Sequence, residues 1–592
     1  MAQFPSVAAC APSAASHRMP SGNAEVSAVF VEIAQLLEVQ GGNPFRIRAY
    51  RNAARMLDAL GQDVRTLADK PDALDALPGI GQDLAGKITE IVKTGSCALV
   101  ERLRKELPPG MAELLKIPGL GPRRVHALYQ ELGVETPQQL RQAAQQGRVR
   151  SVQGWGPISE QRILAAITRM QRKDRRYRRD TLEPVAQALL DDLHAMPGVH
   201  QALAVGSLRR GSDTVGDIDL LVTAEKPGKL MDRLSHSKEV QLVLAKGVIR
   251  CSLLHRSGVQ IDVRAVAPVS WGAAALYFTG SKAHNMAMRR LAQSRGLKLN
   301  EYGLYRGRQR IAGTTEESVF AALGLAFIAP ELREDRGELA AAASAALPHC
   351  VRLCDLQGDL HAHTTDSDGV DSLEAMAAAA QALGLHYLAI TDHGSLLGPP
   401  HGLDENALLR QIDRIDAINA RGGNFLLLKG VEVDILEDGS LGLPDALLRR
   451  LDLVVAAVHS GFELGREQQT DRLLRAMDRP CFSLLAHPLG RLINERPPCD
   501  IDLLRLLRKA RERGCFLELN AQPVRLDLSD LACRMAKSEG VLISINSDAH
   551  SAAQLGYLRW GIAQARRGWL EPGDLLNTRT ADALRALLKS TM

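Results

Sequence analysis

One stretch near the middle of the chain constrains the fold more than any other: AVGSLRRGSDTVGDIDLLV, residues 204–222. An apolar run ends in the Gly206-Ser207 turn, and a second apolar run begins with Asp217 and Asp219. Strand side chains alternate between faces, so both carboxylates point the same way, roughly 6–7 Å apart, a spacing that suits divalent cations. The amides of a Gly-Ser turn beside two arginines can hold a phosphate. The stretch therefore predicts metal-assisted phosphoryl chemistry on a nucleotide.

A third carboxylate follows in VQIDVR, residues 259–264, where Asp262 lies in another alternating strand. Three carboxylates on neighbouring strands can hold two Mg²⁺ ions, one to activate an attacking hydroxyl and one to hold the triphosphate. For a single DxD motif, turn capping or pairing with arginines would be the better explanation. Further on, LYFTGSKAHN at 276–285 places two aromatics before a glycine turn, with Asn285 and Arg289 on the expected helix. This segment can form a platform for a base and sugar, although an aromatic pair more often belongs to the core.

Two copies of one turn pattern precede amphipathic helices in the first third: LPGIG at 77–81 and IPGLG at 117–121. A weaker third copy is VQGWG at 152–156. Glycines let such a helix-hairpin-helix turn approach closely, and amides at the helix start can bind a phosphate oxygen. One copy alone is usually only a turn, but repetition in a basic region predicts contacts with the DNA backbone. The candidate contact residues are Gly79, Gly81, Gly119 and Gly121.

Charge is distributed unevenly along the chain. Residues 1–330 hold 44 Lys and Arg against 31 Asp and Glu, whereas residues 331–592 hold 29 against 37. A basic half is typical of a surface that faces a polyanion. The run RMQRKDRRYRRD, residues 169–180, has seven basic residues. It is either a solvated helix face or a further phosphate contact.

After Asp355 the pattern changes, and short apolar runs alternate with amphipathic helices. This alternation predicts repeated βα units with a parallel sheet or barrel, whose active site lies at the carboxyl ends of the strands. Metal-type residues follow successive runs, whereas a lone histidine there would usually be structural; they are His361, His363, Asp368, Asp392, His393, Glu432, His459, His487, Asp548 and His550. Mixed imidazole and carboxylate ligands suit Mn²⁺, Zn²⁺ or Fe²⁺. Such a cluster could generate hydroxide to attack a phosphoester.

On these motifs, residues 24–330 resemble the family X DNA polymerases, the group that includes DNA polymerase beta. The resemblance implies a lyase-like domain followed by fingers, palm and thumb. It assigns metal binding and catalysis to Asp217, Asp219 and Asp262, triphosphate binding to Ser207 and Arg210, and sugar selection to Tyr277, Phe278 and Gly280. It also assigns nucleotide and template contacts to Asn285 and Arg289, and thumb positioning to Glu301-Tyr302. Gln260 and Lys282 depart from the family pattern, which affects fidelity and nucleotide stacking rather than the chemistry.

By the same resemblance, Lys87 matches the lysine that removes a 5′-deoxyribose phosphate through a Schiff base. A nucleophilic lysine needs a lowered pKa, which cationic neighbours can supply. Arg46 and Arg51 are the candidate neighbours, but Asp83 occupies a position that is basic in DNA polymerase beta. A lysine that only contacts a phosphate remains an equal alternative.

The C-terminal region resembles the PHP domain (polymerase and histidinol phosphatase), a distorted βα barrel with up to three metal ions. The ligand set that the resemblance implies is His361, His363, Asp368, His393, Glu432, His459, His487, Asp548 and His550. Because these positions are filled, we expect an active site there. Residues 24–592 as a whole resemble the bacterial family X polymerases with a C-terminal PHP domain (PolX).

The expected fold is therefore multidomain, with helical helix-hairpin-helix domains, an α+β nucleotidyltransferase palm and thumb, and an α/β PHP barrel. Its expected parts are a disordered tail (1–23), a lyase-like helix-hairpin-helix domain (24–105), a DNA-binding helix-hairpin-helix subdomain (106–178), a palm (179–267), a thumb (268–330), a linker (331–354) and a PHP domain (355–592). The absence of a membrane-length apolar run predicts no membrane partner. Nine cysteines without a CxxC pair fit a reducing cytoplasm, and DNA as the partner would place the protein at the nucleoid.

The expected function is a DNA-directed DNA polymerase that fills short gaps in DNA repair, using dNTPs and Mg²⁺ or Mn²⁺. The PHP domain would act with Mn²⁺ or Zn²⁺ as a 3′→5′ exonuclease on gapped or 3′-recessed DNA. Cleavage at abasic sites and 5′-deoxyribose phosphate lyase activity are additional expectations. Two alternatives remain: a PHP domain that acts on small phosphate monoesters, and a DNA-end-binding scaffold without catalysis.

Overall fold

The computed structural model describes residues 23–59, 64–68, 71–77, 79–106, 110–115, 117, 120–152, 154–173, 176–395 and 402–592. They form two compact units, residues 1–174 and residues 175–592. The tail expected over 1–23 lies outside the described residues, except for Asn23, which begins the first helix. Among the described residues, none of the helices combines the length and apolar character needed to cross a bilayer.

The first unit is helical, as its amphipathic patterns predict. Residues 40–43 separate the first two helices. One apolar core gathers the first five helices, and a second gathers the last four together with Val39. The helices are α1 (Asn23–Val39), α2 (Pro44–Ala59), α3 (Pro71–Asp75), α4 (Gln82–Thr94), α5 (Ala98–Glu106), α6 (Met111–Leu114), α7 (Pro122–Leu132), α8 (Pro137–Gln145) and α9 (Pro157–Lys173).

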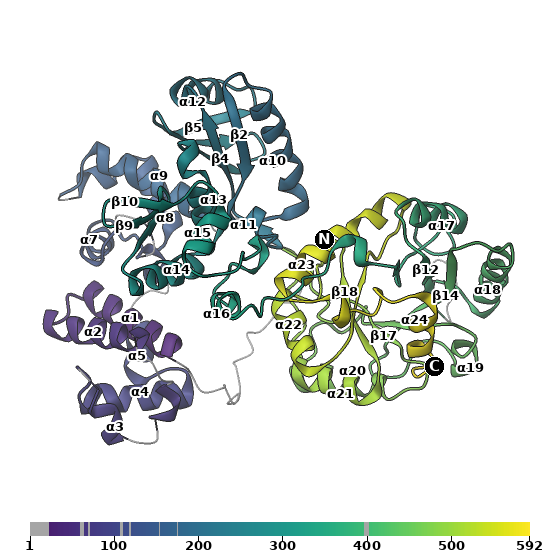
Figure 1. Cartoon of the computed structure of the whole chain (residues 1–592). Coiled ribbons are helices and arrows are strands. Elements are labelled where there is room, and N and C mark those ends of the chain that lie inside the picture. The colour runs from purple at the N-terminus through teal and green to yellow at the C-terminus, as the bar shows by residue number, and fades with distance from the viewer. Residues whose placement is uncertain are drawn as a thin grey trace, which may run out of the picture. The chain divides into compact units, whose positions relative to one another are not determined.

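The second unit begins with a five-stranded palm sheet, seen with its covering helices in Figure 1. Its strands are β2 (Val199–Ala204), β4 (Asp217–Ala224), β7 (Gln260–Ala265), β6 (Arg250–His255) and β5 (Val240–Lys246), in that spatial order. Only β4 and β7 are parallel neighbours. The helices α10 (Arg179–His194) and α12 (Pro227–Ser235) pack on one face of this sheet. Beside it, β1 (Tyr177–Arg178) pairs with β3 (Thr214–Val215), and α11 (Gly206–Arg209) follows β2.

The thumb combines helices with a small antiparallel sheet. Its elements are α13 (Trp271–Thr279), α14 (Lys282–Ser294), β8 (Lys298–Asn300), β9 (Gly303–Arg306), β10 (Gln309–Ala312) and α15 (Glu316–Ala322). Residues 331–354, expected as a linker, are folded onto this core: Leu332 is buried in it, and α16 (Glu338–Ala343) packs against it through Ala342. Arg333 is fully buried, donates from Nε to the carbonyl oxygen of Ile328 (3.0 Å) and pairs with Glu316. The segment is therefore packed rather than exposed: Leu332 and Ala342 lie in the thumb core, whereas Val351 lies in the core of the C-terminal region.

The C-terminal part is a barrel of parallel strands, which confirms the predicted βα units. A three-stranded sheet, β11 (Gly358–Asp359), β12 (Tyr387–Ile390) and β14 (Leu426–Lys429), accompanies a six-stranded one. The six strands are β13 (His393–Gly394), β15 (Glu432–Asp434), β16 (Val455–Ala457), β17 (Leu484–Leu485), β18 (Phe516–Asn520) and β19 (Ile543–Asn546). A parallel bridge between Ala362 and Ala549 links the first and last strand ends.

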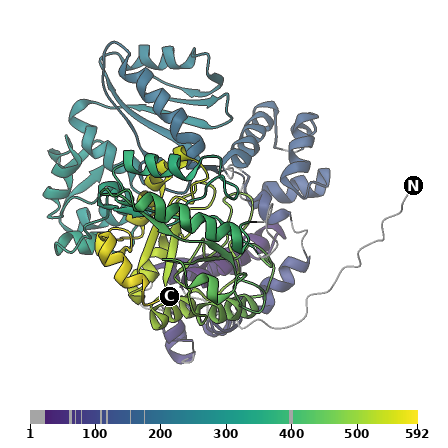
Figure 2. The same cartoon turned by 90° about the vertical axis from the view of Figure 1, so that its right-hand side faces the viewer.

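Helices enclose these strands, as both overall views show (Figures 1 and 2). They are α17 (Leu373–Ala382), α18 (Glu405–Asn419), α19 (Asp445–Leu448), α20 (Arg466–Met477), α21 (Leu503–Arg513), α22 (Asp530–Glu539), α23 (Leu558–Arg567) and α24 (Ala581–Leu588). A large apolar core lies between helices and strands. A smaller core gathers the residues on the other face of the strands, to which α24 adds Leu584 and Leu588. Because both faces of these strands are buried, their sequences are continuous apolar runs.

Candidate functional site

Three aspartates from the two parallel palm strands form the palm carboxylate cluster, Asp217, Asp219 and Asp262. Asp219 and Asp262 are directly paired in the register of β4 and β7. One oxygen of each of the three carboxylates lies within 4.8 Å of the others. Ile218 and Leu220 are buried on the opposite face, as strand alternation predicts. The structure therefore brings the three predicted carboxylates together at a distance that suits a shared cation.

The turn before the cluster depends on a glycine. Gly206 has a φ of +65°, and a Cβ atom added there would overlap the carboxylate of Asp219. The Val205 amide also donates to the carbonyl oxygen of Asp219 (2.8 Å). The close approach of turn and strand thus explains the glycine, which immediately precedes Ser207 in the chain.

Burial and electrostatic repulsion act together on this cluster. Burial, together with the charges of Asp217 and Asp262, raises the pKa of Asp219 to about 7. Asp262 accepts hydrogen bonds from the Ser252 hydroxyl and from Gln260 Nε2 (2.7 Å). Gln260, one of the two departures from the family pattern, therefore still reaches the cluster but brings no positive charge. A divalent cation among the oxygens would remove this repulsion, so the residues present fit a metal site.

Arg210, expected at the triphosphate, is engaged with protein groups. Its Nε donates to Glu334 (2.8 Å) and its Nη1 to the carbonyl oxygen of Thr279 (2.7 Å). Glu334 also accepts from Arg567 of α23 (2.8 Å), which in turn donates to Asp530 (2.8 Å). A phosphate at Arg210 would have to compete with Glu334 for the guanidinium group. We call the connected residues the ion-pair chain: Arg210, Glu334, Arg567, Asp530 and Arg336.

The predicted nucleotide segment is brought together at the end of α13. The rings of Tyr277 and Phe278 meet edge to face with centroids 5.1 Å apart, and the Arg289 guanidinium lies 5.8 Å from the Tyr277 ring centre. Asn285 Nδ2 donates to the carbonyl oxygens of Tyr277 (2.6 Å) and Gly280 (3.1 Å). Asn285 Oδ1 is buried and makes no hydrogen bond within the described part of the chain. A Cβ on Gly280 would crowd this amide, so the glycine is what lets the Asn285 side chain pack against the turn.

The second site lies where the barrel strands end. We call it the histidine cluster, and it consists of His361, His363, Asp368, His393, Glu432, His459, His487, Asp548 and His550. Apart from Asp368, which lies farther along the loop after β11, each residue lies just beyond the carboxyl end of β11, β12, β14, β16, β17 or β19. Parallel strands end at one rim of a barrel, so residues scattered over 190 positions in the sequence converge there.

Glu432 lies at the centre of the histidine cluster. Its Oε2 is 3.3 Å from His361 Nε2, 3.5 Å from His363 Nε2 and 3.3 Å from His393 Nδ1. Its Oε1 is 3.1 Å from His487 Nε2 and 3.3 Å from His459 Nε2. A single buried carboxylate therefore faces five imidazoles, an arrangement that suits a ligand shared between metal ions.

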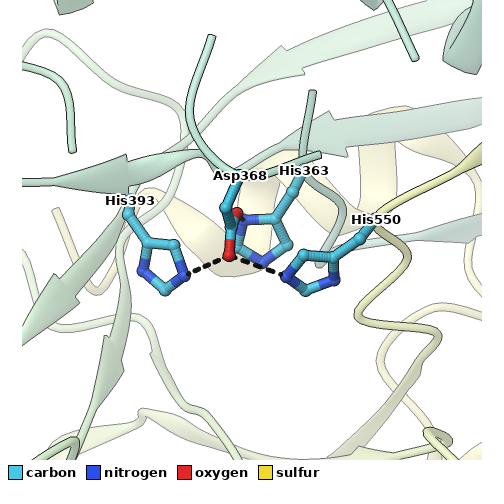
Figure 3. A group of neighbouring side chains, drawn as sticks. All are labelled: His363, Asp368, His393 and His550. Carbon is cyan, nitrogen blue, oxygen red and sulfur yellow. Dashed lines mark hydrogen bonds and ion pairs between the residues drawn. The ribbon is translucent and has the colours of Figure 1, made fainter. Parts of the chain in front are cut away.

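The rest of the cluster divides around this carboxylate. His361 and His363 lie beside Asp548, and Asp548 Oδ1 is 3.2 Å from His363 Nε2. Asp368 stands between His393 and His550, as Figure 3 shows, with Oδ2 3.5 Å and 3.2 Å from their Nε2 atoms. The three groups that could each hold a cation are His361–His363–Asp548, His393–Glu432–His459 and His363–Asp368–His393–His550.

Buried nitrogen atoms without hydrogen bonds show that these residues fit metal ions. His361 Nε2, both ring nitrogens of His363 and His487 Nδ1 are buried and lack a hydrogen bond among the described residues. Burial raises the pKa of Glu432, but the charge of His361 and hydrogen bonds from neighbouring imidazoles outweigh it and hold the pKa well below its usual range. Burial lowers the pKa of His459, but Asp434 and Glu432 outweigh it and raise the pKa to about 10. Divalent cations bound by these nitrogens and oxygens would take the place of these protons.

Sequence reasoning missed two carboxylates that accept hydrogen bonds from histidines of the cluster. Glu518 in β18 is fully buried and accepts from His361 Nδ1 (2.8 Å). Its signal was an acidic residue in the middle of the apolar run CFLEL. Asp434 accepts from His459 Nδ1 (2.6 Å). Asp392, one of the metal-type residues of the pattern, instead accepts from Thr364, Ser367 and Gln411 and so anchors the loop that leads to Asp368.

The three predicted hairpin turns share one backbone hydrogen bond among their described residues. The amides of Ile80, Leu120 and Trp155 each donate to the carbonyl oxygen three residues earlier, at 3.0 Å. Gly79 and Gly154 share a φ near +80°, and Gly81 and Gly121 begin α4 and α7 with exposed turns. The weak third copy is therefore a hairpin of the same kind. Gly119 lies outside the described residues.

Lys87 lies on α4, but its partner is acidic. Its ammonium group pairs with Asp83 one turn earlier, and Arg51, an expected cationic neighbour, pairs with Glu38. This pairing suits a charged lysine that contacts a phosphate or stabilises the helix.

The described arginines of the basic run have protein partners. Arg176 donates to Thr214 Oγ1 (2.8 Å), Arg178 pairs with Asp180 (3.1 Å), and Arg179 lies over the Trp560 ring at 4.9 Å. The side chains of residues 169–175 lie outside the described ones. For these three arginines, the structure favours a role inside the second unit over a phosphate contact.

Comparisons with known proteins agree with this organisation. Family models match a helix-hairpin-helix domain at residues 21–97, a SAM-like helix-hairpin-helix tandem at 111–169, a DNA polymerase beta thumb at 274–334 and a PHP domain at 359–521. Rat DNA polymerase lambda is 24% identical over 359 residues, which are 54% of this chain and 57% of that protein. A probable phosphatase of Thermoanaerobacter sp. (strain X514) is 29% identical over 232 residues, 37% of this chain and 89% of that protein.

One relative matches almost from end to end. The DNA polymerase/3′-5′ exonuclease PolX of Bacillus subtilis (strain 168) is 36% identical over 561 residues, 94% of this chain and 97% of that protein. This coverage, with the thumb and PHP matches, confirms the predicted multidomain fold. The similarity extends over all the domains and is not limited to a single one. Divalent-metal dependence and DNA binding follow from these domains. The chain belongs to the bacterial family X DNA polymerases that carry a C-terminal PHP domain, the PolX family.

Proposed function

We propose that this chain is a DNA repair enzyme with two separate metal-dependent active sites. The palm carboxylate cluster would extend a primer with dNTPs across short gaps, and the histidine cluster would hydrolyse phosphodiesters in the 3′→5′ direction. The observation that carries the proposal is that both clusters are complete in one chain that aligns with the polymerase/exonuclease of B. subtilis over 94% of its length.

In the polymerase site, Asp217, Asp219 and Asp262 would hold Mg²⁺ or Mn²⁺. Bound ions supply activation of the primer hydroxyl and neutralise the charge of the triphosphate. Asp262 is oriented by Ser252 and Gln260, so its oxygens are fixed before the substrate arrives. Ser207 and Arg210 would bind the triphosphate, Arg210 after it leaves Glu334.

The sugar and base would lie against the end of α13. The edge of Tyr277 and Phe278 would exclude a bulkier sugar, and Gly280 leaves space for Asn285. Asn285, whose Oδ1 makes no hydrogen bond among the described residues, would contact the nucleotide, and Arg289 would contact the template side.

In the PHP site, the histidine cluster would hold up to three Mn²⁺ or Zn²⁺ ions, one for each of the three groups, with His487 beside them at Glu432. Bound ions supply a hydroxide nucleophile and polarise the phosphoryl oxygen. The chain's own contribution is the ring of oriented imidazoles around Glu432. Gapped or 3′-recessed duplex DNA would be held by backbone contacts of the hairpin turns, which would place the protein with the chromosomal DNA of the cytoplasm.

A second candidate for the PHP site is the hydrolysis of small phosphate monoesters. The likeness of 37% of the chain to a probable phosphatase favours it. The same metal chemistry would serve both reactions, because each needs a hydroxide and a stabilised phosphoryl group.

The test compares the purified chain with Asp217→Ala and His361→Ala in the presence of Mn²⁺. We expect the wild type to fill gapped DNA and to shorten 3′-recessed DNA, Asp217→Ala to lose only filling, and His361→Ala to lose only shortening. Intact filling in Asp217→Ala would overturn the polymerase assignment, and intact shortening in His361→Ala would overturn the nuclease assignment. Rapid hydrolysis of p-nitrophenyl phosphate without DNA degradation would favour the monoester candidate.

A further inference from the structure

The buried carboxylate of Glu518 lies under the histidine cluster without facing its centre. Its Oε1 accepts from His361 Nδ1 (2.8 Å) and Asn546 Nδ2 (2.9 Å). Its Oε2 accepts from the backbone amide of His487 (2.7 Å) and from Asn520 Nδ2 (3.1 Å). Four donors thus occupy the two oxygens, and a carboxylate engaged in this way is a poor metal ligand.

The contact with His361 fixes which ring nitrogen can bind a cation. When Nδ1 donates its proton to Glu518, the lone pair of the neutral ring belongs to Nε2. His361 Nε2 is the nitrogen that points to Glu432 and lacks a hydrogen bond among the described residues. Glu518 therefore sets both the orientation and the tautomer of this imidazole.

The contact with His487 acts on the backbone. His487 has a φ of +28°, a region that residues with a Cβ rarely adopt. Its amide donates to Glu518, and its side chain reaches Glu432 with Nε2 at 3.1 Å. The same carboxylate thus holds two ligands that come from different strand ends and face one central carboxylate.

We propose that Glu518 is a positioning residue of the PHP metal site, which orients His361 and His487 and does not bind metal itself. The inference rests on the proposed function only in requiring that the histidine cluster binds divalent cations. A carboxylate that orients a metal-binding histidine typically contributes 10–100-fold to metal affinity.

Glu518→Gln tests this role with little change in shape. A glutamine has one acceptor oxygen, so its NH₂ group must face donors: either His361 Nδ1–H and Asn546, or the His487 amide and Asn520. In the first orientation the NH₂ group of the glutamine faces His361 Nδ1. This nitrogen can accept the hydrogen bond only if the ring proton moves to Nε2, and Nε2 then has no lone pair for a metal ion. The matched control is Asp434→Asn, because Asp434 holds His459 Nδ1 in the same way but is 52% exposed, so water can replace it.

The measurement is a titration of the metal-stripped full chain with Zn²⁺ against a chromophoric chelator, with the visible spectrum of Co²⁺ as a second readout. For Glu518→Gln we expect binding weaker by about 10–100-fold and an altered Co²⁺ spectrum. For Asp434→Asn we expect less than about a threefold loss. In the His361→Ala background, Glu518→Gln should add less than in the wild type, because it acts in part through that ring.

Unchanged Zn²⁺ affinity and Co²⁺ spectrum in folded Glu518→Gln would overturn the inference while leaving the proposed function intact. Failure of the wild type to bind Zn²⁺ would overturn both. If Glu518→Gln does not fold, the test is the ¹⁵N spectrum of the histidine rings in the Zn²⁺-loaded wild type, which shows which ring nitrogen carries the proton and which binds metal. The His361 signals are assigned as those that are missing from the spectrum of His361→Ala. A proton on Nδ1 and metal on Nε2 would support the inference, and the reverse arrangement would refute it.

Discussion

The palm carboxylate cluster and the histidine cluster both gather acidic groups, but they balance the charge in opposite ways. In the palm, burial and two like charges raise the pKa of Asp219 to about 7. In the barrel, burial acts in the same direction on Asp548, yet His361 and His363 outweigh it and hold the pKa of Asp548 far below its usual range. The palm thus depends on arriving cations to relieve repulsion, whereas the barrel contains its own positive partners.

The largest expected effect separates the two centres by activity. Asp219→Asn should lower gap filling by on the order of 10³-fold and leave DNA degradation unchanged, because it removes a metal-binding oxygen only from the palm. Glu432→Gln should do the reverse, since Glu432 faces five imidazoles of the other cluster. Initial rates on gapped and 3′-recessed DNA measure both.

Exposed acidic residues provide the controls for this pair. Asp192→Asn on α10 and Glu437→Gln after β15 should leave both rates unchanged. If Glu432→Gln slowed filling as much as degradation, the two centres could not be treated as independent.

A second prediction concerns the sign of the stability change without metal. At pH 8, Asp219→Asn should stabilise the metal-free second unit by about 1–3 kcal/mol, because it removes like-charge repulsion. Glu432→Gln should destabilise it by a similar amount, because it leaves positively charged imidazoles without their acidic partner. Thermal unfolding in EDTA measures the two shifts, and shifts of equal sign would contradict the comparison.

The third prediction is the pH dependence that Asp219 contributes to the stability of the metal-free chain. The pKa of Asp219 rises from its ordinary value of 3.8 to about 7 in the folded chain, so the folded state binds an extra proton between those values. The stabilising contribution of this proton is complete below about pH 4 and is lost as the pH rises through 7. Between pH 5 and pH 8 the metal-free wild type should therefore lose stability relative to Asp219→Asn. A constant difference in melting temperature across this range would exclude the shift.

The smallest expected effect tests whether the two regions influence each other. Glu334→Gln keeps an acceptor beside Arg210 but removes the charge that competes with a triphosphate. The KM for the nucleotide should fall by less than about tenfold, with kcat unchanged. Glu331→Gln is the matched control, because Glu331 lies in the same segment but pairs with Arg566 (2.8 Å). Equal KM changes in both variants would show that Arg210 is not the cause.

Local patterns predicted the elements that carry the chemistry. The alternation around Asp217 and Asp219 fixed the face of the carboxylates, since a strand has a period of two. The positions of His361, Glu432 and Asp548 after apolar runs predicted one rim, since parallel strands end on the same side. In both cases one short motif contains enough information to orient its own side chains.

Contacts between distant segments escaped prediction. Glu518 reaches His361 across 157 positions, and Arg210 reaches Glu334 across 124. Nothing in the local sequence indicates such a partner, because a buried charge reveals its pairing only when the elements are packed. Residues 331–354 were expected as a linker for the same reason: their charges look solvent-exposed until Arg333 is seen buried beside Glu316.

The ion pairs between residues 331–336 and the C-terminal region also determine how stable separate fragments of this protein would be. A cut within residues 335–354 would leave Glu331 and Glu334 on one fragment and their partners Arg566 and Arg567 on the other. Each fragment would then present half-buried charges without their counterparts, which lowers its solubility and stability. Two fragments produced together and allowed to associate, and not either one alone, are therefore the form in which the separate activities should be compared with those of the intact chain.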